Sequence, residues 1–330
     1  MLARKKRTFT VIGMASVFGL LLSACSTTND DNASADSASA TVVATTTQVG
    51  SIAEQITACA GGETQILMSA GDDPHQFEAS SAQIADMVTA DLVISNGLGL
   101  ESSMQRSIDN AVTDGAEVFE LAPALDPLPL DDDHHHDAHE AHDHGHEHEH
   151  EHQHEHGDYD AHIWMDVARM ADGAELIGEN IADITDDQAY VDCGTEVAED
   201  LRDVDAQIAD ILGDLDSARL VTDHAAYGYF ADRYGVEISG VVIPGGSTDG
   251  EPSSQDLTAL TALLNDAGAD ALVTSKANTN RMISALADES GGNIPVVELY
   301  ESAIGEPGSD AETYQDAMLY NATALAEALS

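Results

Sequence analysis

Histidines are the residues of this 330-residue chain whose number and spacing point most directly to chemistry. Twelve of the 15 fall in one run interleaved with Asp and Glu, and only His75, His162 and His224 occur elsewhere. Neutral imidazole binds Zn(II) and other borderline divalent ions well, and three imidazoles supply most of a tetrahedral zinc site. Any one of the three could equally be a structural histidine. Because the rest of the chain has no others, the set favours one shared metal site.

Each of the three isolated histidines lies at a position that suits a ligand. His75 follows a predicted strand by a few residues, and His224 comes almost directly after another. His162 precedes a predicted helix, two residues before Trp164, the only tryptophan. In open α/β sheets, ligands gather at the carboxyl ends of the strands. The spacing therefore predicts that both halves of the chain contribute to one site.

The His-rich run, residues 131–158, contains 11 acids, no Lys or Arg and almost nothing apolar. Because such a segment cannot bury a core, we expect a disordered surface loop that binds divalent ions in many weak, exchanging arrangements. The alternative is a solvated polyelectrolyte without a metal role. The histidines of this auxiliary loop are His134, His135, His136, His139, His142, His144, His146, His148, His150, His152, His154 and His156.

The start of the chain predicts export. Arg4-Lys5-Lys6-Arg7 precedes an uncharged, mostly apolar run that ends in Leu22-Ser23-Ala24-Cys25. This is the pattern of a bacterial lipoprotein signal, and the run is too short for a membrane span. We expect a signal peptide over residues 1–24, a diacylated Cys25 that anchors the protein outside the cytoplasm at the cell membrane, and a flexible tether over residues 25–40. The alternative is a cleaved, soluble export signal with an incidental cysteine.

Two further cysteines, Cys59 and Cys193, remain, and an exported protein would hold them in an oxidising compartment. A disulfide between them is a reasonable hypothesis, and two separate buried thiols are the alternative.

The charge balance excludes one class of partner. The formal net charge is -50, with 61 acids and 11 basic residues. So negative a field repels phosphate backbones, which excludes nucleic-acid binding, and attracts cations. Only 14 of the acids lie in the tether and the His-rich run, so most of the charge belongs to the predicted lobes. Lys276 is the only lysine outside the signal peptide, which resembles adaptation to a salty habitat; acidic drift is the alternative.

Hydrophobic periodicity predicts an α/β fold. Short β-branched runs at residues 41–46, 64–69, 91–95 and 116–120 alternate with helical patterns at 51–59, 80–89 and 101–112. The second half repeats this with strands at 219–222, 236–242, 271–274 and 295–299 and helices at 225–234, 254–267, 278–290 and 311–329. Apolar residues spaced by three and four across 187–215 predict one helix of about 25 residues. We therefore expect an N-terminal lobe over 41–182, a linking helix within 183–215, and a C-terminal lobe over 216–330.

Several motifs, in this order and at these intervals, resemble those of the cluster A-I metal-binding lipoproteins, the solute-binding subunits of zinc and manganese ABC importers. They are Asp73-Pro74-His75 with Phe77-Glu78, Asn96-Gly97-Leu98-Gly99-Leu100-Glu101, the acidic His-rich run, His162-Ile163-Trp164-Met165-Asp166, His224-Ala225-Ala226-Tyr227-Gly228-Tyr229-Phe230, Glu251-Pro252-Ser253 and Gly305-Glu306-Pro307-Gly308. The resemblance covers essentially the whole chain after the signal peptide.

The resemblance implies two (β/α) lobes joined by a backbone helix, with the metal in the cleft between them. It implies delivery of the metal to an ABC permease that is driven by a cytoplasmic ATPase. The zinc branch uses three histidines, which correspond to His75, His162 and His224; the manganese branch typically has Glu at the third position. His224 therefore favours Zn(II) over Mn(II) as the transported ion.

One position departs from the family pattern. Where the family usually has a fourth ligand, Asp, this chain has Ser302, with Glu301 beside it. Glu301 is the predicted fourth ligand; water, an acid of the His-rich run or Ser302 itself are the alternatives.

Two other functions remain open on the sequence. A surface adhesin that carries zinc structurally, with a role in cell adhesion, would share every motif. A zinc hydrolase would also use three histidines, but the chain lacks HExxH, and its general base would have to be Glu301 or Asp223. We therefore predict a binding protein and not an enzyme.

Overall fold

The computed structural model describes residues 39–130 and 159–330, except 214, 216, 244, 249, 251–252, 254–257, 259, 263, 265–267 and 278–280. The predicted signal peptide, Cys25, the tether up to residue 38 and the His-rich run lie outside these residues, as does most of the helix predicted at 254–267. Among the described helices, none combines the length and apolar character that a membrane span requires.

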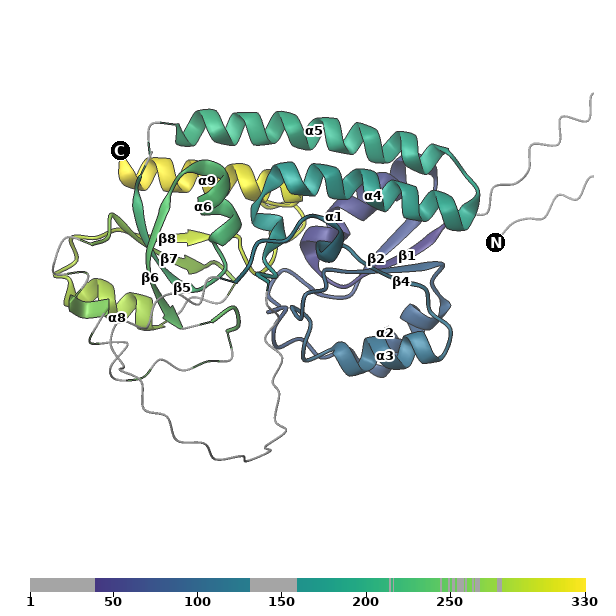
Figure 1. The fold of residues 1–330 in the computed structure, drawn as a ribbon, viewed down its shortest axis with the longest axis horizontal. Coiled ribbons are helices and arrows are strands. Elements are labelled where there is room, and N and C mark those ends of the chain that lie inside the picture. The colour runs from purple at the N-terminus through teal and green to yellow at the C-terminus, as the bar shows by residue number, and fades with distance from the viewer. Residues whose placement is uncertain are drawn as a thin grey trace, which may run out of the picture. The chain divides into compact units, whose positions relative to one another are not determined.

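The N-terminal lobe is built on a parallel sheet of four strands in the order β2-β1-β3-β4 (Figure 1). The central strands β1 (Thr41–Ala44) and β3 (Leu92–Ser95) are the more buried, and β2 (Glu63–Ile66) and β4 (Val118–Glu120) form the edges. The helices between strands are α1 (Thr47–Ala60), α2 (Ser81–Thr89) and α3 (Gln105–Thr113). A short 3-10 helix, Ala122–Ala124, follows β4.

Local sequence explains where two of these helices begin and end. The Thr46 side chain accepts a hydrogen bond from Val49 N at the start of α1, and Gly61 ends that helix in the left-handed conformation at φ 90°. Ser80 and Gln83 form a reciprocal capping box at the start of α2. Both helices therefore begin where the sequence provides oxygen atoms for otherwise unpaired backbone N–H groups.

The C-terminal lobe repeats the same topology, with parallel strands in the order β6-β5-β7-β8. The strands are β5 (Arg219–His224), β6 (Glu237–Ile243), β7 (Ala271–Ser275) and β8 (Val296–Leu299). The helices are α6 (Gly228–Tyr234), α8 (Arg281–Glu289) and α9 (Tyr314–Leu329). In both lobes the first strand has neighbours reached in opposite directions, so its carboxyl end lies at a topological switch point, where such sheets bind ligands.

Two long helices, α4 (Val167–Thr185) and α5 (Ala189–Leu212), connect the lobes. Figure 1 shows α5 running alongside α4 at one end and alongside α9 at the other. With 24 residues, α5 is about 36 Å long. Its contact with α4 is close because a Cβ atom on Gly178 would lie 2.5 Å from the Tyr190 carbonyl oxygen. One hydrophobic cluster includes residues of both lobes and of α5, so the helix packs against each lobe.

The predicted α/β class, with two lobes and one long helix, is confirmed. Several boundaries differ. Ser39 and Ala40, predicted as tether, bond to the lobe through Ser39 Oγ to Gly61 O and Ala40 N to Tyr190 Oη. The helix predicted from residue 101 begins at Gln105, because the Glu101 carboxylate turns back to accept hydrogen bonds from Asn96 N and Gly97 N. Helix α4 continues past the predicted lobe boundary at residue 182.

A disulfide joins Cys59, in the last turn of α1, to Cys193 on α5. Cys193 is buried and Cys59 is exposed. The bond ties the N-terminal lobe to the linking helix, as the sequence led us to expect, and it leaves no pair of separate thiols at these positions.

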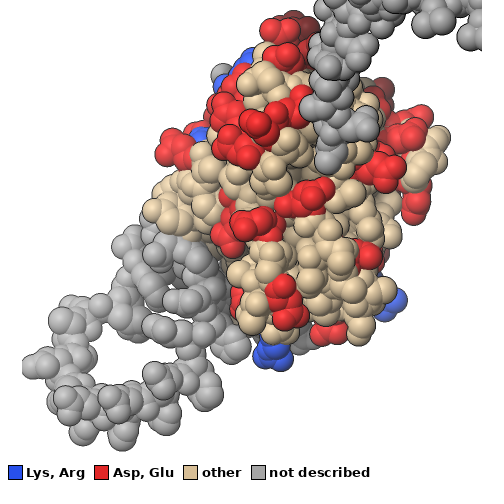
Figure 2. Space-filling view, turned by 90° about the vertical axis from the view of Figure 1, so that its right-hand side faces the viewer, with Lys and Arg blue, Asp and Glu red and all other residues tan. Residues whose placement is uncertain are grey.

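The surface is acidic over the face seen in Figure 2, where Asp and Glu side chains greatly outnumber Lys and Arg. Several of the arginines pair with acids from other parts of the chain. Arg202 on α5 bonds to Asp172 and Glu175 on α4, and Arg233 on α6 bonds to Asp205 on α5. These arginines therefore hold the linking helix to its neighbours.

Candidate metal centre

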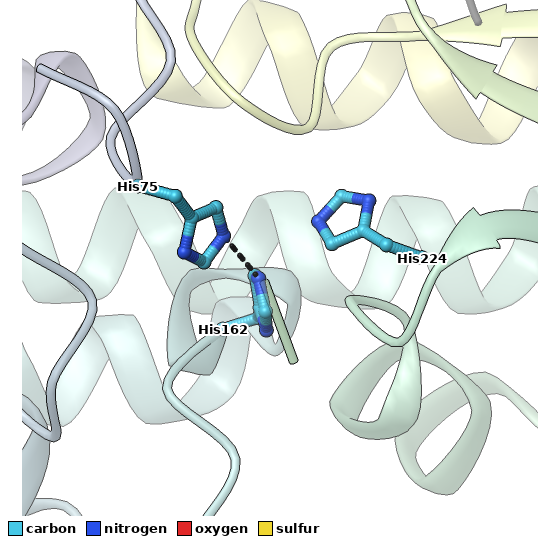
Figure 3. A group of neighbouring side chains, drawn as sticks. All are labelled: His75, His162 and His224. Carbon is cyan, nitrogen blue, oxygen red and sulfur yellow. Dashed lines mark hydrogen bonds between the residues drawn. The ribbon is translucent and has the colours of Figure 1, made fainter. Parts of the chain in front are cut away.

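The structure brings the three isolated histidines together. His75 lies in the loop after β2, His162 directly precedes the 3-10 helix Ile163–Met165, and His224 is the last residue of β5. Each offers a ring nitrogen that lies within 4.8 Å of those of the other two. All three side chains are buried, and Figure 3 shows the rings converging from different segments. The predicted shared site is therefore present in the geometry.

His75 and His162 come closest, with 3.2 Å between their Nε2 atoms. The ring centroids of His224 lie 5.7 Å from His75 and 5.2 Å from His162. Three ring nitrogens within 4.8 Å of one another, from residues far apart in sequence, can bind a single cation between them.

His75 is held in place through its backbone. Asp73 Oδ1 accepts a hydrogen bond from His75 N at 3.0 Å, and Ser103 Oγ donates to His75 O at 2.6 Å. The other carboxylate oxygen of Asp73 accepts from Thr248 Oγ1 at 2.7 Å. Because Thr248 belongs to the C-terminal lobe, this contact links the His75 loop to the opposite side of the site.

His162 is oriented by Asp160. One oxygen, Oδ1, accepts from the backbone N of His162 at 2.9 Å and pairs with ring Nδ1 at 2.7 Å. A ring that donates from Nδ1 keeps the lone pair of Nε2 for a metal. Gly228 makes room for Asp160, since a Cβ atom there would lie 2.8 Å from Oδ2. Asn96 Nδ2 donates to Ala161 O at 2.9 Å and fixes the segment between the two residues.

His224 has the same arrangement with Asp223. Oδ1 of Asp223 lies 2.9 Å from both the backbone N and ring Nδ1 of His224. The second oxygen accepts from Thr274 Oγ1 at 3.1 Å and Ser275 N at 3.0 Å, at the end of the neighbouring strand β7. His224 Nε2 is therefore the ring nitrogen left to face the site, and it is buried without a hydrogen-bond partner in the described part of the chain.

Glu301 lies on the other side of His224. Its Oε1 is 3.6 Å from His224 Nε2, and this oxygen too is buried without a hydrogen-bond partner among the described residues. The backbone carbonyl of Glu301 accepts from Gln48 Nε2 at 2.7 Å and Trp164 Nε1 at 2.9 Å, both from the N-terminal lobe. A buried oxygen and a buried nitrogen that face each other without partners are the donor atoms that a cation would satisfy.

The ionisation of these groups follows from burial and from this pairing. Burial, together with the neighbouring His162 and His224, lowers the pKa of His75 to about 3, so the ring is neutral and ready to bind a metal. Burial disfavours a charged His224, but Glu301 and Asp223 outweigh it and raise the pKa well above the usual value. Burial likewise opposes charge on Glu301, but His224 lowers its pKa to about 2. With no cation bound, a proton on His224 therefore balances the Glu301 carboxylate.

A pocket of about 640 Å³ opens beside the site. Its lining combines the His75 loop, through Asp72, Asp73 and Glu78, with the C-terminal lobe, through His224 and Ser302. An acidic lining raises the local concentration of cations. The pocket therefore forms a suitable route to the histidines.

No role in holding the histidines was predicted from the sequence for their neighbouring aspartates. The signal is visible in retrospect, because each of the three candidate histidines has an Asp one or two residues earlier: Asp73, Asp160 and Asp223. In each case that Asp accepts a hydrogen bond from the backbone N of the histidine. The predicted auxiliary loop and Cys25 lie outside the described residues.

Comparison with known proteins agrees with the fold and the site. The chain matches the family described as zinc-uptake complex component A, periplasmic (ZnuA), over residues 42–328. It belongs to this family. ZnuA-family proteins are non-catalytic binding components of ABC transporters, so the protein is an extracytoplasmic metal-binding component of such an uptake system, and the hydrolase alternative is wrong.

Relatives within this group carry the names of two metals. The chain is 26% identical over 330 residues to the manganese-binding lipoprotein MntA of Halalkalibacterium halodurans, covering 99% of each protein. It is 25% identical over 296 residues to the zinc-binding protein TroA of Treponema pallidum, covering 86% of this chain and 88% of TroA. The solved TroA structure superposes with a TM-score of 0.74 at 22% identity, covering 88% of this chain and 99% of TroA, which shows the shared fold.

Proposed function

We propose that the protein captures Zn(II) with His75, His162, His224 and Glu301 and delivers it to an ABC permease powered by a cytoplasmic ATPase. The observation that supports this proposal is the convergence of three buried histidine nitrogens. Beside the nitrogen of His224 lies Glu301 Oε1, which has no hydrogen-bond partner among the described residues. Three nitrogens and one carboxylate oxygen form a donor set typical of tetrahedral zinc.

The choice between zinc and manganese rests on donor chemistry. Mn(II) favours oxygen-rich, higher-coordinate sites, whereas imidazole suits zinc, and most divalent first-row metals bind nitrogen ligands more tightly than manganese does. The alternative has its own support, because MntA, which matches nearly the full length, is named for manganese. Mn(II) would need additional oxygen ligands, and the adjacent pocket is lined by the carboxylates of Asp72, Asp73 and Glu78.

The test is metal analysis after competition. Apo protein equilibrated with equal Zn(II) and Mn(II) should retain about one tightly bound zinc per chain once residues 131–158 are deleted, and more in the full chain. Equal retention of manganese would refute the zinc assignment. Loss of tight binding on deletion would show that the auxiliary loop, and not the three isolated histidines, forms the high-affinity site.

The ligands are tested singly. We expect His224→Ala and Glu301→Ala each to weaken zinc binding at least tenfold, because each removes one donor from a four-coordinate site. Thr313→Ala, which removes an exposed helix cap on α9, is a suitable control for a mutation in the same lobe. Zinc affinity within twofold of wild type for Glu301→Ala would remove it from the ligand set and leave water, an acid of the auxiliary loop or Ser302.

The proposed cellular context follows from the first segment of the sequence. We infer that Cys25 is diacylated and holds the protein at the outer face of the membrane, near the permease. Related proteins such as MntA are named lipoproteins, which supports this inference. Replacement of Cys25 by Ala should shift the protein from the membrane fraction to the soluble fraction and leave zinc affinity unchanged.

A further inference from the structure

Two buried serines in the C-terminal lobe, Ser302 and Ser275, connect Glu301 to Asp223 through hydrogen bonds. Ser302 Oγ donates to Glu301 Oε2 at 2.8 Å, and Ser275 Oγ lies 2.9 Å from Ser302 Oγ. Ser275 is the last residue of β7, and its backbone N donates to Asp223 Oδ2 at 3.0 Å. These contacts extend from Glu301 to the aspartate that orients His224.

Two contacts of His224, one with Asp223 and one with Glu301, complete a closed cycle of interactions. From Asp223 the path continues through Oδ1 to His224 Nδ1 at 2.9 Å, and from His224 Nε2 back to Glu301 Oε1 at 3.6 Å. Every residue in the cycle is nearly inaccessible to solvent; the most exposed, Ser302, is 5% accessible. Solvent therefore reaches these hydrogen bonds only through the pocket that Ser275 and Ser302 help to line.

The direction of the donors in the cycle is determined by counting protons. A serine hydroxyl has one proton to donate. Ser302 uses its proton on Glu301, so the Ser275 hydroxyl must donate to Ser302. The backbone N–H of Ser275 and the Nδ1–H of His224 both point at Asp223. These donors are thus committed along the cycle, and Glu301 Oε1 and His224 Nε2 face each other across the gap without a hydrogen-bond partner among the described residues.

We propose that Ser302, supported by Ser275, is a positioning residue that fixes the Glu301 carboxylate for metal coordination and couples its orientation to that of His224. This inference rests on the proposed function, in which Glu301 is the fourth ligand. The Glu301 side chain has rotatable bonds that a single backbone anchor does not restrain, and the Ser302 hydroxyl supplies the second anchor. Outer-shell groups of this kind typically contribute about 10–100-fold to metal affinity.

A double-mutant cycle tests the coupling. Zinc affinity is measured by competition with a chelator for wild type, Ser302→Ala, Glu301→Ala and the double variant. We expect Ser302→Ala to weaken binding about tenfold in the wild-type background and to have no further effect once Glu301 is Ala. Ser275→Ala should give a smaller loss that also disappears in the Glu301→Ala background. Ser302→Thr, which keeps the hydroxyl, should restore affinity.

A spectroscopic readout separates positioning from general loosening of the fold. Co(II) replaces zinc, and its visible absorption depends on the number and geometry of ligands. Ser302→Ala should change the Co(II) spectrum in the same direction as Glu301→Ala. The control Ser290→Ala, which removes a serine hydroxyl bond to Ala287 O just after the end of α8, should not. Thermal unfolding of each apo variant monitors folding independently of the metal.

The outcomes distinguish this proposal from the one on which it rests. If Glu301→Ala leaves zinc affinity and the Co(II) spectrum unchanged, the ligand assignment fails and the positioning role fails with it. If Glu301→Ala weakens binding but Ser302→Ala does not, or the two losses simply add, Glu301 remains a ligand and the positioning role of Ser302 is wrong.

Discussion

The disulfide between Cys59 and Cys193 should make a large and calculable contribution to folding stability. The bond closes a loop over a sequence separation of 134 residues. In the chain-entropy model, a loop of this size restricts the unfolded chain by about 17 cal/mol/K, which corresponds to about 5 kcal/mol at 25 °C. Replacement of both cysteines by Ala should therefore lower the free energy of unfolding by up to about 5 kcal/mol. Neither cysteine belongs to the metal centre, so zinc affinity should stay within twofold of wild type.

Urea unfolding of the apo protein, monitored by circular dichroism, measures this difference. Wild type in reductant should unfold at the same urea concentration as the Cys59→Ala/Cys193→Ala variant, and both well below oxidised wild type. Thiol titration of unfolded, non-reduced protein should detect neither cysteine when Cys25 is absent. Two free thiols, or an unfolding midpoint that reductant does not move, would refute the bridge. A tenfold loss of zinc affinity in the variant would show that the bond also holds the metal site.

Three further predictions concern the site and the linking helix. Gln48→Leu removes a 2.7 Å hydrogen bond to Glu301 O and should speed zinc release about fivefold, the scale of one neutral hydrogen bond, in stopped-flow displacement by a chelator. Although burial opposes it, Glu301 raises the pKa of His224, so zinc must displace a proton. Affinity should therefore rise about tenfold per pH unit up to that pKa, with about one proton released in calorimetry across buffers of different ionisation heat. Arg233→Ala breaks the pair with Asp205 and, because Arg233 is 40% exposed, should lower the free energy of unfolding by only about 2 kcal/mol, without changing zinc affinity.

The local parts of the fold could be predicted because they depend on short-range physics. The alternation of β-branched runs with amphipathic segments located all eight described strands to within a few residues of their observed bounds. The apolar spacing that predicted one long helix corresponds to the buried face of α5, which includes Val197, Leu201, Val204 and Ile208. Predictions were less accurate where a side chain redirects the backbone, as at Glu101, because its carboxylate is also held by Thr45 Oγ1, which lies 56 residues earlier in the sequence.

The candidate metal-binding histidines could also be recognised in the sequence, as could the aspartates beside them. Asp160 and Asp223 are one or two residues from His162 and His224, so these contacts are local in sequence. The partition of histidines, three outside the acidic run and twelve within it, predicted a metal-binding protein from the sequence alone.

The tertiary structure decided how those ligands meet. His75 and His162 are 87 residues apart in sequence, yet their Nε2 atoms lie 3.2 Å from each other, because the loop after β2 and the segment before α4 meet in the folded chain. The sequence alone does not place Glu301 beside His224. That position depends on contacts from Gln48 and Trp164 to the Glu301 carbonyl oxygen and on the pairing of Ser275 with Ser302, which involve three other segments. Contacts between residues that are neighbours in the sequence, such as the Asp–His pairs, can be predicted from the sequence. A site built from several separate segments forms only when long-range packing brings those segments together.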